Sequence, residues 1–158
     1  MSGAIDRFME AARVEGLEPA VRRFPEGTKT AQDAARAIGC DVGQIVKSLV
    51  FMADDRPVMA FTSGANRVDE SKLGEIVGAA SVRRATPEEA RTATGFAVGG
   101  TPPFGHPKRL TCVVDHDLLG WGELWAAAGT PDSVFPLSPA DLLRVTGAVP
   151  SAFAADRA

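Results

Sequence analysis

Residues 46–62 read VKSLVFMADDRPVMAFT, in which two apolar stretches flank a short polar turn. The first stretch, Val46 to Ala53, and the second, Val58 to Thr62, are rich in the β-branched and aromatic residues that are typical of strands. The residues DDRP between them favour a turn. This part of the sequence therefore predicts a β-hairpin, with shorter elements before and after it.

The segment TPEE at residues 86–89 is the strongest local helix signal in the chain. Thr86 suits the N-cap position, and Pro87 suits the first position of the helix. Glu89 suits the third position, where its side chain can complete a capping box. Further helices are expected over residues 3–15, from Thr30 to Gly39, over 70–77 and from Ser138 to Gly147, with a short turn capped by Asp41 and Gln44. Short strands are expected over residues 81–84, 96–98, 110–114, 124–127 and 134–137.

Short strands mixed with several short helices indicate an α+β fold with a mixed or antiparallel sheet, rather than a regular βαβ repeat. A chain of 158 residues is long enough for one domain to bury about two thirds of its unfolded surface. We therefore expect a single domain over residues 1–158, in which residues 151–158 form a frayed tail.

The composition is that of an ordinary globular protein, with 45% hydrophobic and 23% charged residues. No apolar run approaches the roughly 20 residues that a membrane span requires, and the N-terminal segment has acids where a signal peptide needs an apolar core. We therefore expect a cytoplasmic protein that contacts no membrane. Cys40 and Cys112 stand far apart without a CxxC spacing, so we interpret them as free buried thiols.

The formal net charge of −3 argues against a protein that coats nucleic acid with its whole surface. A local basic patch is still compatible with this charge, and so is scattered solvated charge. The basic residues of interest lie in the first two thirds of the chain: Arg22, Arg23, Lys29, Lys47, Arg67, Lys72, Arg83, Arg84, Lys108 and Arg109.

Lys47 stands inside an otherwise apolar predicted strand. If side chains alternate between faces, it shares a face with Leu49 and Phe51, where an unpaired ammonium is costly. One interpretation is a lysine at a strand's start whose head reaches water. The other is a fixed cation that faces a phosphate, a carboxylate or a polarised carbonyl.

Residues 95–105, GFAVGGTPPFG, form a loop rich in glycine and proline. The loop lacks both the GK[ST] of a P-loop and the GxGxxG of a dinucleotide fold. Either it is a structural turn, or Pro102 and Pro103 hold a bend in which the amides of Gly99, Gly100 and Thr101 face a ligand. These three residues and Lys47 are the candidate catalytic residues.

Other polar positions offer weaker signals. The chain has no GxSxG, CxxC or HExxH motif, so we expect neither a side-chain nucleophile of that type nor a metal or other cofactor. His106, after the glycine loop, is a candidate ligand contact, although a surface role is favoured. The segment SGANRVD at 63–69 is a second loop of small residues, in which Arg67 suits a phosphate or ribose contact.

Four stretches of the chain, in their order and spacing, resemble the YbaK/ProX-type family of aminoacyl-tRNA deacylases, which includes the editing insertion domain of bacterial prolyl-tRNA synthetases. They are TAQDAARAIGCDVGQIVKSLVF, SGANRVDESKL, TGFAVGGTPPFGH and WAAAGTPDSVFPLSPADLLRVTG. With the segments between them they cover about residues 28–147. The resemblance implies one YbaK-like domain with a barrel-like sheet, preceded by the helix over 3–15.

The resemblance also implies an activity. A free-standing member hydrolyses the ester between a wrong amino acid and the 3′ end of a tRNA, commonly the tRNA for proline. The family's required lysine corresponds to Lys47, and its GxxxP loop corresponds to residues 99–103. Catalysis there relies on backbone amides, water and the ribose hydroxyl, which agrees with a chain that offers a lysine and a backbone loop but no triad. The implied partners are the acceptor end of an aminoacyl-tRNA and an aminoacyl-tRNA synthetase, and not DNA.

On this basis the predicted substrate-binding residues are Pro102, Pro103, Phe104, Gly105, His106, Ser63, Gly64 and Arg67. Members that act on cysteinyl-tRNA tend to carry GG-x-S-P in the loop, whereas Pro102 replaces that serine here. The change argues against cysteine and leaves small residues such as alanine, serine or 2-aminobutyrate. Two other functions stay open, namely a noncatalytic module that binds a tRNA end, a nucleotide or a synthetase, and hydrolysis of another activated small ester.

Overall fold

The predicted hairpin is the centre of the fold. The computed structural model describes residues 3–25 and 30–156. In it, β2 (Val46–Ala53) and β3 (Arg56–Ser63) pair antiparallel along their whole length, from Val46 opposite Ser63 to Ala53 opposite Arg56. Asp54 and Asp55 make the turn with φ of 48° and 67°, the left-handed geometry of a tight two-residue hairpin. The hairpin prediction is confirmed.

Two sheets are built on this hairpin. The five-stranded sheet has the order β4-β2-β3-β5-β8, with β4 (Val82–Arg84) antiparallel to β2 and with β5 (Thr111–Asp115) and β8 (Val149–Ser151) parallel to their neighbours. The three-stranded antiparallel sheet has the order β1-β7-β6, made of Arg22–Arg23, Ser133–Leu137 and Leu124–Ala127. The prediction of an α+β domain with mixed strand pairing is therefore confirmed.

The expected closure into a barrel is not found. Among the described residues, the two sheets are linked by a single bridge between Ile45, just before β2, and Trp125 of β6. On its other flank, β4 covers only Phe51 to Ala53 of β2. A gap therefore stays open along the first half of β2, because neither neighbouring strand is long enough to cover it.

Local capping rules explain where most helices begin and end. The side chains of Thr30, Asp69, Thr86 and Ser138 accept backbone hydrogen bonds at the helix starts, and glycines in the left-handed region follow the same four helices. The helices are α1 (Ala4–Val14), α2 (Ala31–Ile38), α3 (Glu70–Val77), α4 (Pro87–Thr94) and α5 (Pro139–Thr146), with the short 3-10 turns η1 (Val42–Gln44) and η2 (His116–Leu118). No helix among the described residues is both long and apolar enough to cross a membrane.

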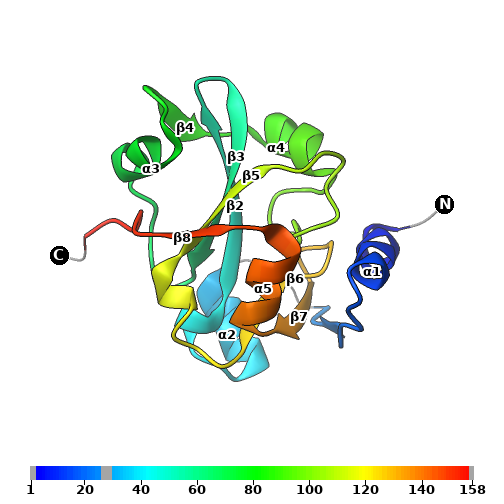
Figure 1. Cartoon of the computed structure of the whole chain (residues 1–158). Helices are drawn as coiled ribbons and strands as arrows, with labels where there is room; N and C mark the ends of the chain where they lie inside the picture. The colour runs from blue at the N-terminus through cyan, green and yellow to red at the C-terminus, as the bar shows by residue number, and fades with distance from the viewer. Residues whose placement is uncertain (1–2, 26–29, 157–158) are drawn as a thin grey trace.

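The elements surround the hairpin, which runs through the middle of the molecule in Figure 1, with α2 near one end and α3 and β4 near the other. The main core lies between the hairpin, α1 and the small sheet. There the rings of Phe8, Phe104 and Phe135 pack together with centroid distances of 4.6 to 6.1 Å. A second cluster on the opposite face of the hairpin includes Phe51 and Phe153.

Two local predictions are wrong. Residues 96–98 form a turn and not a strand. The apolar Phe96 suggested a strand, but its side chain is instead buried in the main core. Of the predicted tail 151–158, residues 151–156 are not frayed, since Phe153 is fully buried and its carbonyl accepts a hydrogen bond from Asp69 N at 2.8 Å. Residues 157–158 lie outside the described residues. The buried ring of Phe153, the bridge between Val68 and Ala154, and the hydrogen bond from Ala155 N to Arg67 O together hold this terminal segment in place.

The two cysteines are free, as expected, but each is half-buried rather than buried. Burial raises the pKa of the Cys112 thiol to about 11, so the thiol stays protonated at neutral pH.

The capping box of α4 makes a pH-dependent contribution to stability. Arg83 donates to both carboxylate oxygens of Glu89 at 2.7 and 2.8 Å, and Thr86 N donates to the same carboxylate. These contacts lower the pKa of Glu89 from 4.5 to about 2. A lowered carboxyl pKa means that the contribution is complete above the unfolded pKa and is lost as the pH falls through about 2.

We therefore expect a Glu89→Gln variant to melt at a lower temperature than the wild type at neutral pH. The difference should disappear as the pH falls from about 4.5 toward 2. Thermal melts at a series of pH values measure it. Glu88→Gln, at the exposed neighbouring position, is the matched control and should show a smaller difference. A gap between Glu89→Gln and wild type that does not change with pH would contradict this account.

Candidate functional site

A cavity with a volume of about 530 Å³ lies along the uncovered part of β2. Consecutive residues 46–50 all line it, which means that the cavity follows the edge of the strand instead of one face. The other walls are residues 84–85 and Ala90, the turn residues Val98, Gly99 and Thr101, residues 125–127 of β6, the segment Pro131, Ser133 and Val134, and Thr30, Ala31, Ala34 and Ile45.

Main-chain groups of β2 face this cavity. Ile45 O accepts from Gly64 N on the β3 side, whereas Val50 O accepts from Ala85 N on the other side. Because backbone groups alternate sides along an antiparallel strand, those of Ser48 point the same way as those of Val50. Strand β4 does not reach Ser48, so its N–H and C=O are directed toward the cavity.

Lys47 lines the cavity and is half-buried. Its Nζ donates to the carbonyl oxygen of Asn66 at 2.5 Å. Burial lowers the pKa of Lys47, and the positive charges of Arg84 and Arg67 lower it further, against the opposing effect of Asp115. The ammonium is therefore held in position and is less well solvated than an ordinary surface lysine.

A buried carboxylate supports the residue that holds Lys47. Asp115 is 2% exposed, and its carboxylate accepts hydrogen bonds from Asn66 Nδ2 at 2.8 Å and from Ser63 N at 3.1 Å. Asn66 Nδ2 also donates to Asp117 at 2.7 Å. This network fixes the loop after β3, and with it the carbonyl that Lys47 contacts.

Arg84 also lines the cavity, although the sequence named it only among the basic residues and not as a candidate site residue. Arg84 lies over the ring of Phe51, with 5.5 Å between Cζ and the ring centroid. Its neighbour Arg83 instead pairs with Glu89. Alternation along β4 places the two arginines on opposite faces, and this was the signal that could have separated them. The described residues that line the cavity include the cations Lys47 and Arg84 and no Asp or Glu.

The other basic residues are partly scattered, as one of the two interpretations expected. Arg23, Lys72 and Arg83 each pair with a carboxylate. Lys29 lies outside the described residues. Around Lys47 the positive charges of Arg67 and Arg84 form a local cationic region.

The glycine loop contributes only part of what was expected. Gly99, with φ of 89°, and Thr101 line the cavity. Gly100 does not, because its N–H donates to Ala97 O at 3.0 Å inside the turn and its Cα packs against the backbone of Thr130. The candidate backbone donors at the cavity are therefore the amides of Gly99 and Thr101.

Beyond Thr101 the loop leaves this cavity. Pro102 is buried and is not among the lining residues. Phe104 belongs to the main core. The segment from Pro103 to His106 lines a separate cavity of about 200 Å³ with Lys108 and Arg109. The structure thus divides the predicted loop site in two, because burial of Phe104 pulls the chain away from Lys47.

His106 is held within the loop. Its Nε2 lies 2.9 Å from Pro102 O, and burial lowers the pKa of the imidazole. Pro102, Pro103, Phe104, Gly105 and His106 therefore do not share the cavity of Lys47.

The segment after β3 supports the site from behind. Ser63 Oγ donates to Gly43 O at 2.9 Å, and Gly64 packs so closely on Val42 O that a side chain has no room. Neither residue lines the cavity, and neither does Arg67, although the charge of Arg67 acts on Lys47.

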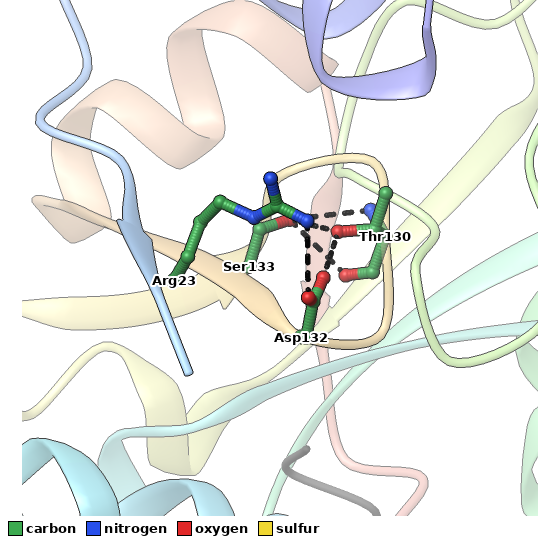
Figure 2. A network of polar contacts seen from close by, with 4 residues as sticks. All are labelled: Arg23, Thr130, Asp132 and Ser133. Atoms are coloured by element: carbon green, nitrogen blue, oxygen red, sulfur yellow. Dashed lines mark hydrogen bonds and ion pairs between the residues drawn. The ribbon is translucent and has the colours of Figure 1, made fainter. Parts of the chain in front are cut away.

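The wall opposite β2 is held by a small polar network, shown in Figure 2. Thr130 Oγ1 contacts Asp132 Oδ1 at 2.5 Å and Ser133 Oγ at 2.7 Å, and Arg23 donates to Asp132 at 3.1 Å. Asp132 O also accepts from Phe24 N, which ties the turn to the residue after β1. The network fixes the turn against which Gly100 packs.

Comparisons with known proteins agree on the relationship. A family model described as an aminoacyl-tRNA editing domain matches residues 25–145. The chain is 35% identical to the proline–tRNA ligase of Nitratidesulfovibrio vulgaris (strain DP4) over 119 residues, which are 71% of this chain and 21% of the ligase. It is 30% identical to the proline–tRNA ligase of Streptococcus sanguinis (strain SK36) over 115 residues, or 73% of this chain and 19% of the ligase. The chain therefore spans about a fifth of the length of these relatives.

The fold has a near match among solved structures. A crystal structure of a protein proposed as a trans-editing enzyme for prolyl-tRNA synthetase is 43% identical, with a TM-score of 0.93 and 99% of both chains covered. Because the family model matches most of the sequence and this similarity covers nearly all of the fold, the chain belongs to the aminoacyl-tRNA editing domain family.

Proposed function

We propose that this protein is a trans-editing hydrolase that removes the amino acid from mischarged aminoacyl-tRNA. The observation that carries the proposal is the cavity in which Lys47, Arg84 and the turn of Gly99 and Thr101 meet along an open strand edge. It occurs in a chain of the aminoacyl-tRNA editing domain family. The acceptor end of the tRNA is the proposed partner, and an aminoacyl-tRNA synthetase is a second one.

The charges of the cavity suit the end of a tRNA. Lys47 and Arg84 line it, and no described lining residue is acidic. Cations of this kind attract the phosphates that flank the terminal adenosine. An ammonium has three N–H donors, of which the structure assigns one to Asn66 O. The other donors of Lys47 are then directed to a phosphate or to the aminoacyl group.

The chemistry requires positioning more than a strong nucleophile. An aminoacyl ester is activated, so a water molecule oriented by the neighbouring ribose hydroxyl is a sufficient attacking group. The water oxygen bonds to the carbonyl carbon, the ester bond breaks, the ribose oxygen takes up a proton, and the amino acid leaves with a free carboxyl group. The amides of Gly99 and Thr101 would stabilise the negative charge that develops on the ester carbonyl oxygen, with Lys47 adding a positive field. Under this mechanism Lys47, Gly99 and Thr101 are the reacting site, whereas Gly100 shapes the turn.

Much of the cavity wall is apolar, and Ala31, Ala34, Ala90, Ala126 and Ala127 all line it. Such a wall suits an uncharged aminoacyl side chain, because a buried charge without a partner is costly. We propose a small non-cognate residue as the group removed. The relationship to proline–tRNA ligases supports tRNA-Pro as its carrier. Pro102 lies outside the lining, so the cavity offers no direct contact by which this proline would select against cysteine.

The direct test is hydrolysis of a panel of tRNA-Pro molecules that carry alanine, serine, cysteine, 2-aminobutyrate or proline. We expect the small non-cognate esters to be cleaved well above the spontaneous rate and prolyl-tRNA to be largely spared. Release of labelled amino acid measures the rate. Binding of the tRNAs without faster release would overturn the hydrolase proposal and favour the noncatalytic module.

A further inference from the structure

Ser48 carries a polar atom that the fold leaves unsatisfied. Among the described residues, its Oγ is the buried side-chain nitrogen or oxygen without any hydrogen-bond partner. Buried polar groups are nearly always paired, because an unpaired one costs folding free energy. Ser48 stands next to Lys47 and lines the same cavity along β2. The unpaired hydroxyl therefore belongs to the middle residue of the stretch of β2, residues 46–50, that lines the cavity.

The other hydroxyl side chains of the cavity are already used. Thr30 accepts from Asp33 N at the cap of α2, Thr101 donates to Ala97 O, and Ser133 is bonded to Thr130. Ser48 thus differs from every other described hydroxyl residue in the lining.

The residue has a way to present its hydroxyl to a ligand. Ser48 as a whole is half-buried, although its Oγ is covered. Serine has three staggered rotamers about χ1, so one rotation moves the oxygen without any change in the backbone. The Ser48 carbonyl faces the same space, as the pairing of Val50 O with Ala85 N requires. Ser48 can therefore offer two acceptors to a ligand in the cavity, its carbonyl oxygen and, after this rotation, its Oγ.

The charge of the cavity indicates which group of the substrate would bind to the two acceptors of Ser48. An aminoacyl ester carries an α-amino group, which needs hydrogen-bond acceptors. The described lining offers no carboxylate for it and has two cations. Neutral acceptors are what remain, and Ser48 supplies two of them.

We propose that Ser48 binds the α-amino group of the aminoacyl substrate through its Oγ and its backbone carbonyl. This inference rests on the proposed function. It makes Ser48 the residue that distinguishes an aminoacyl ester from a simple acyl ester. Lys47 and Arg84 are left to the phosphate and ester end, away from the amine that they would repel.

The test compares two substrates and two enzymes. One tRNA carries alanine, and the other carries propionic acid, which is alanine without its amino group. Ser48→Ala should lower kcat/KM for alanyl-tRNA by about tenfold, the value of one ordinary hydrogen bond, and leave propionyl-tRNA within about twofold of wild type. Wild type should itself prefer alanyl-tRNA by about tenfold or more. Equal slowing of both substrates, or of neither, would overturn the inference.

Stability provides an independent readout. Removal of an unpaired hydroxyl should leave the melting temperature of Ser48→Ala unchanged or raised. Ser133→Ala is the matched comparison, since it removes a hydroxyl from the same cavity that is bonded to Thr130. That variant should melt lower and slow both substrates alike. If wild type cleaves neither ester, the proposed function itself fails, and that outcome is distinct from failure of the Ser48 assignment.

Discussion

A Lys47→Ala variant is expected to deacylate mischarged tRNA about 100 to 1,000 times more slowly than wild type, as is typical when a fixed electrostatic donor is removed from an active site. The structural reason is that Lys47 Nζ is half-buried and anchored to Asn66 O at 2.5 Å. The pKa of this amine is lowered by burial and by Arg84 and Arg67. A cation held in that way keeps one position beside the cavity before substrate binds.

Single-turnover release of labelled amino acid, with enzyme in excess, measures the chemical step directly. Lys72→Ala is the matched control, because Lys72 pairs with Asp156 and Ala154 O and does not line the cavity. Lys72→Ala should retain the wild-type rate. The melting temperature of Lys47→Ala should change little, since the lost hydrogen bond is offset by removal of a poorly solvated charge. A Lys47→Ala rate within a few-fold of wild type would show that the cavity is not the reacting site.

The second large effect is expected from Gly100→Ala, which should destabilise the fold by about 1–3 kcal/mol. A β-carbon on Gly100 would lie 2.7 Å from Thr130 Cα and 2.9 Å from Gly129 O. Both atoms are backbone, and the network of Thr130, Asp132 and Ser133 holds the turn that carries them. Because that turn has little freedom to retreat, the loop with Gly99 and Thr101 must move instead.

We therefore expect Gly100→Ala to lose activity as well as stability, although Gly100 does not line the cavity. Urea unfolding gives the free energy, and in a domain of this size each kcal/mol corresponds to about 2–4 °C in melting temperature. Gly120→Ala is the control, since a β-carbon there meets nothing within 4 Å. Equal stability of the two variants would mean that the close approach at Gly100 is not a constraint.

Much of the secondary structure could be predicted, because its signals are local. The caps at Thr30 and Thr86 involve residues three positions apart, and both helices begin where the sequence indicates. The hairpin of residues 46–63 likewise depends on adjacent stretches of chain. The strand predicted over residues 96–98 was wrong because its apolar character has a long-range cause. Phe96 is apolar because it packs in the main core, and not because the segment pairs as a strand.

The site could be predicted only in part. Lys47, Gly99 and Thr101 line one cavity, as the motifs suggested. Phe104 and His106 do not, since the loop turns toward Phe8 and Phe135 after Thr101. Nothing in the order of residues indicates on which side of a buried aromatic ring a loop will continue.

By itself, the sequence determined the family, the hairpin with its helices, and the lysine on the central strand. These follow from spacings of a few residues and from ordered motifs. Only the tertiary structure decided where the cavity lies. The pairing of β4 with β2 ends at Phe51, and the bridge from β6 reaches the chain at Ile45, just before β2. The edge of β2 between these two positions therefore stays open. At that opening Ser48 and Arg84 line the cavity. The open edge of β2 depends on how far strands distant in the sequence pair with each other, and no local pattern encodes the lengths of those pairings.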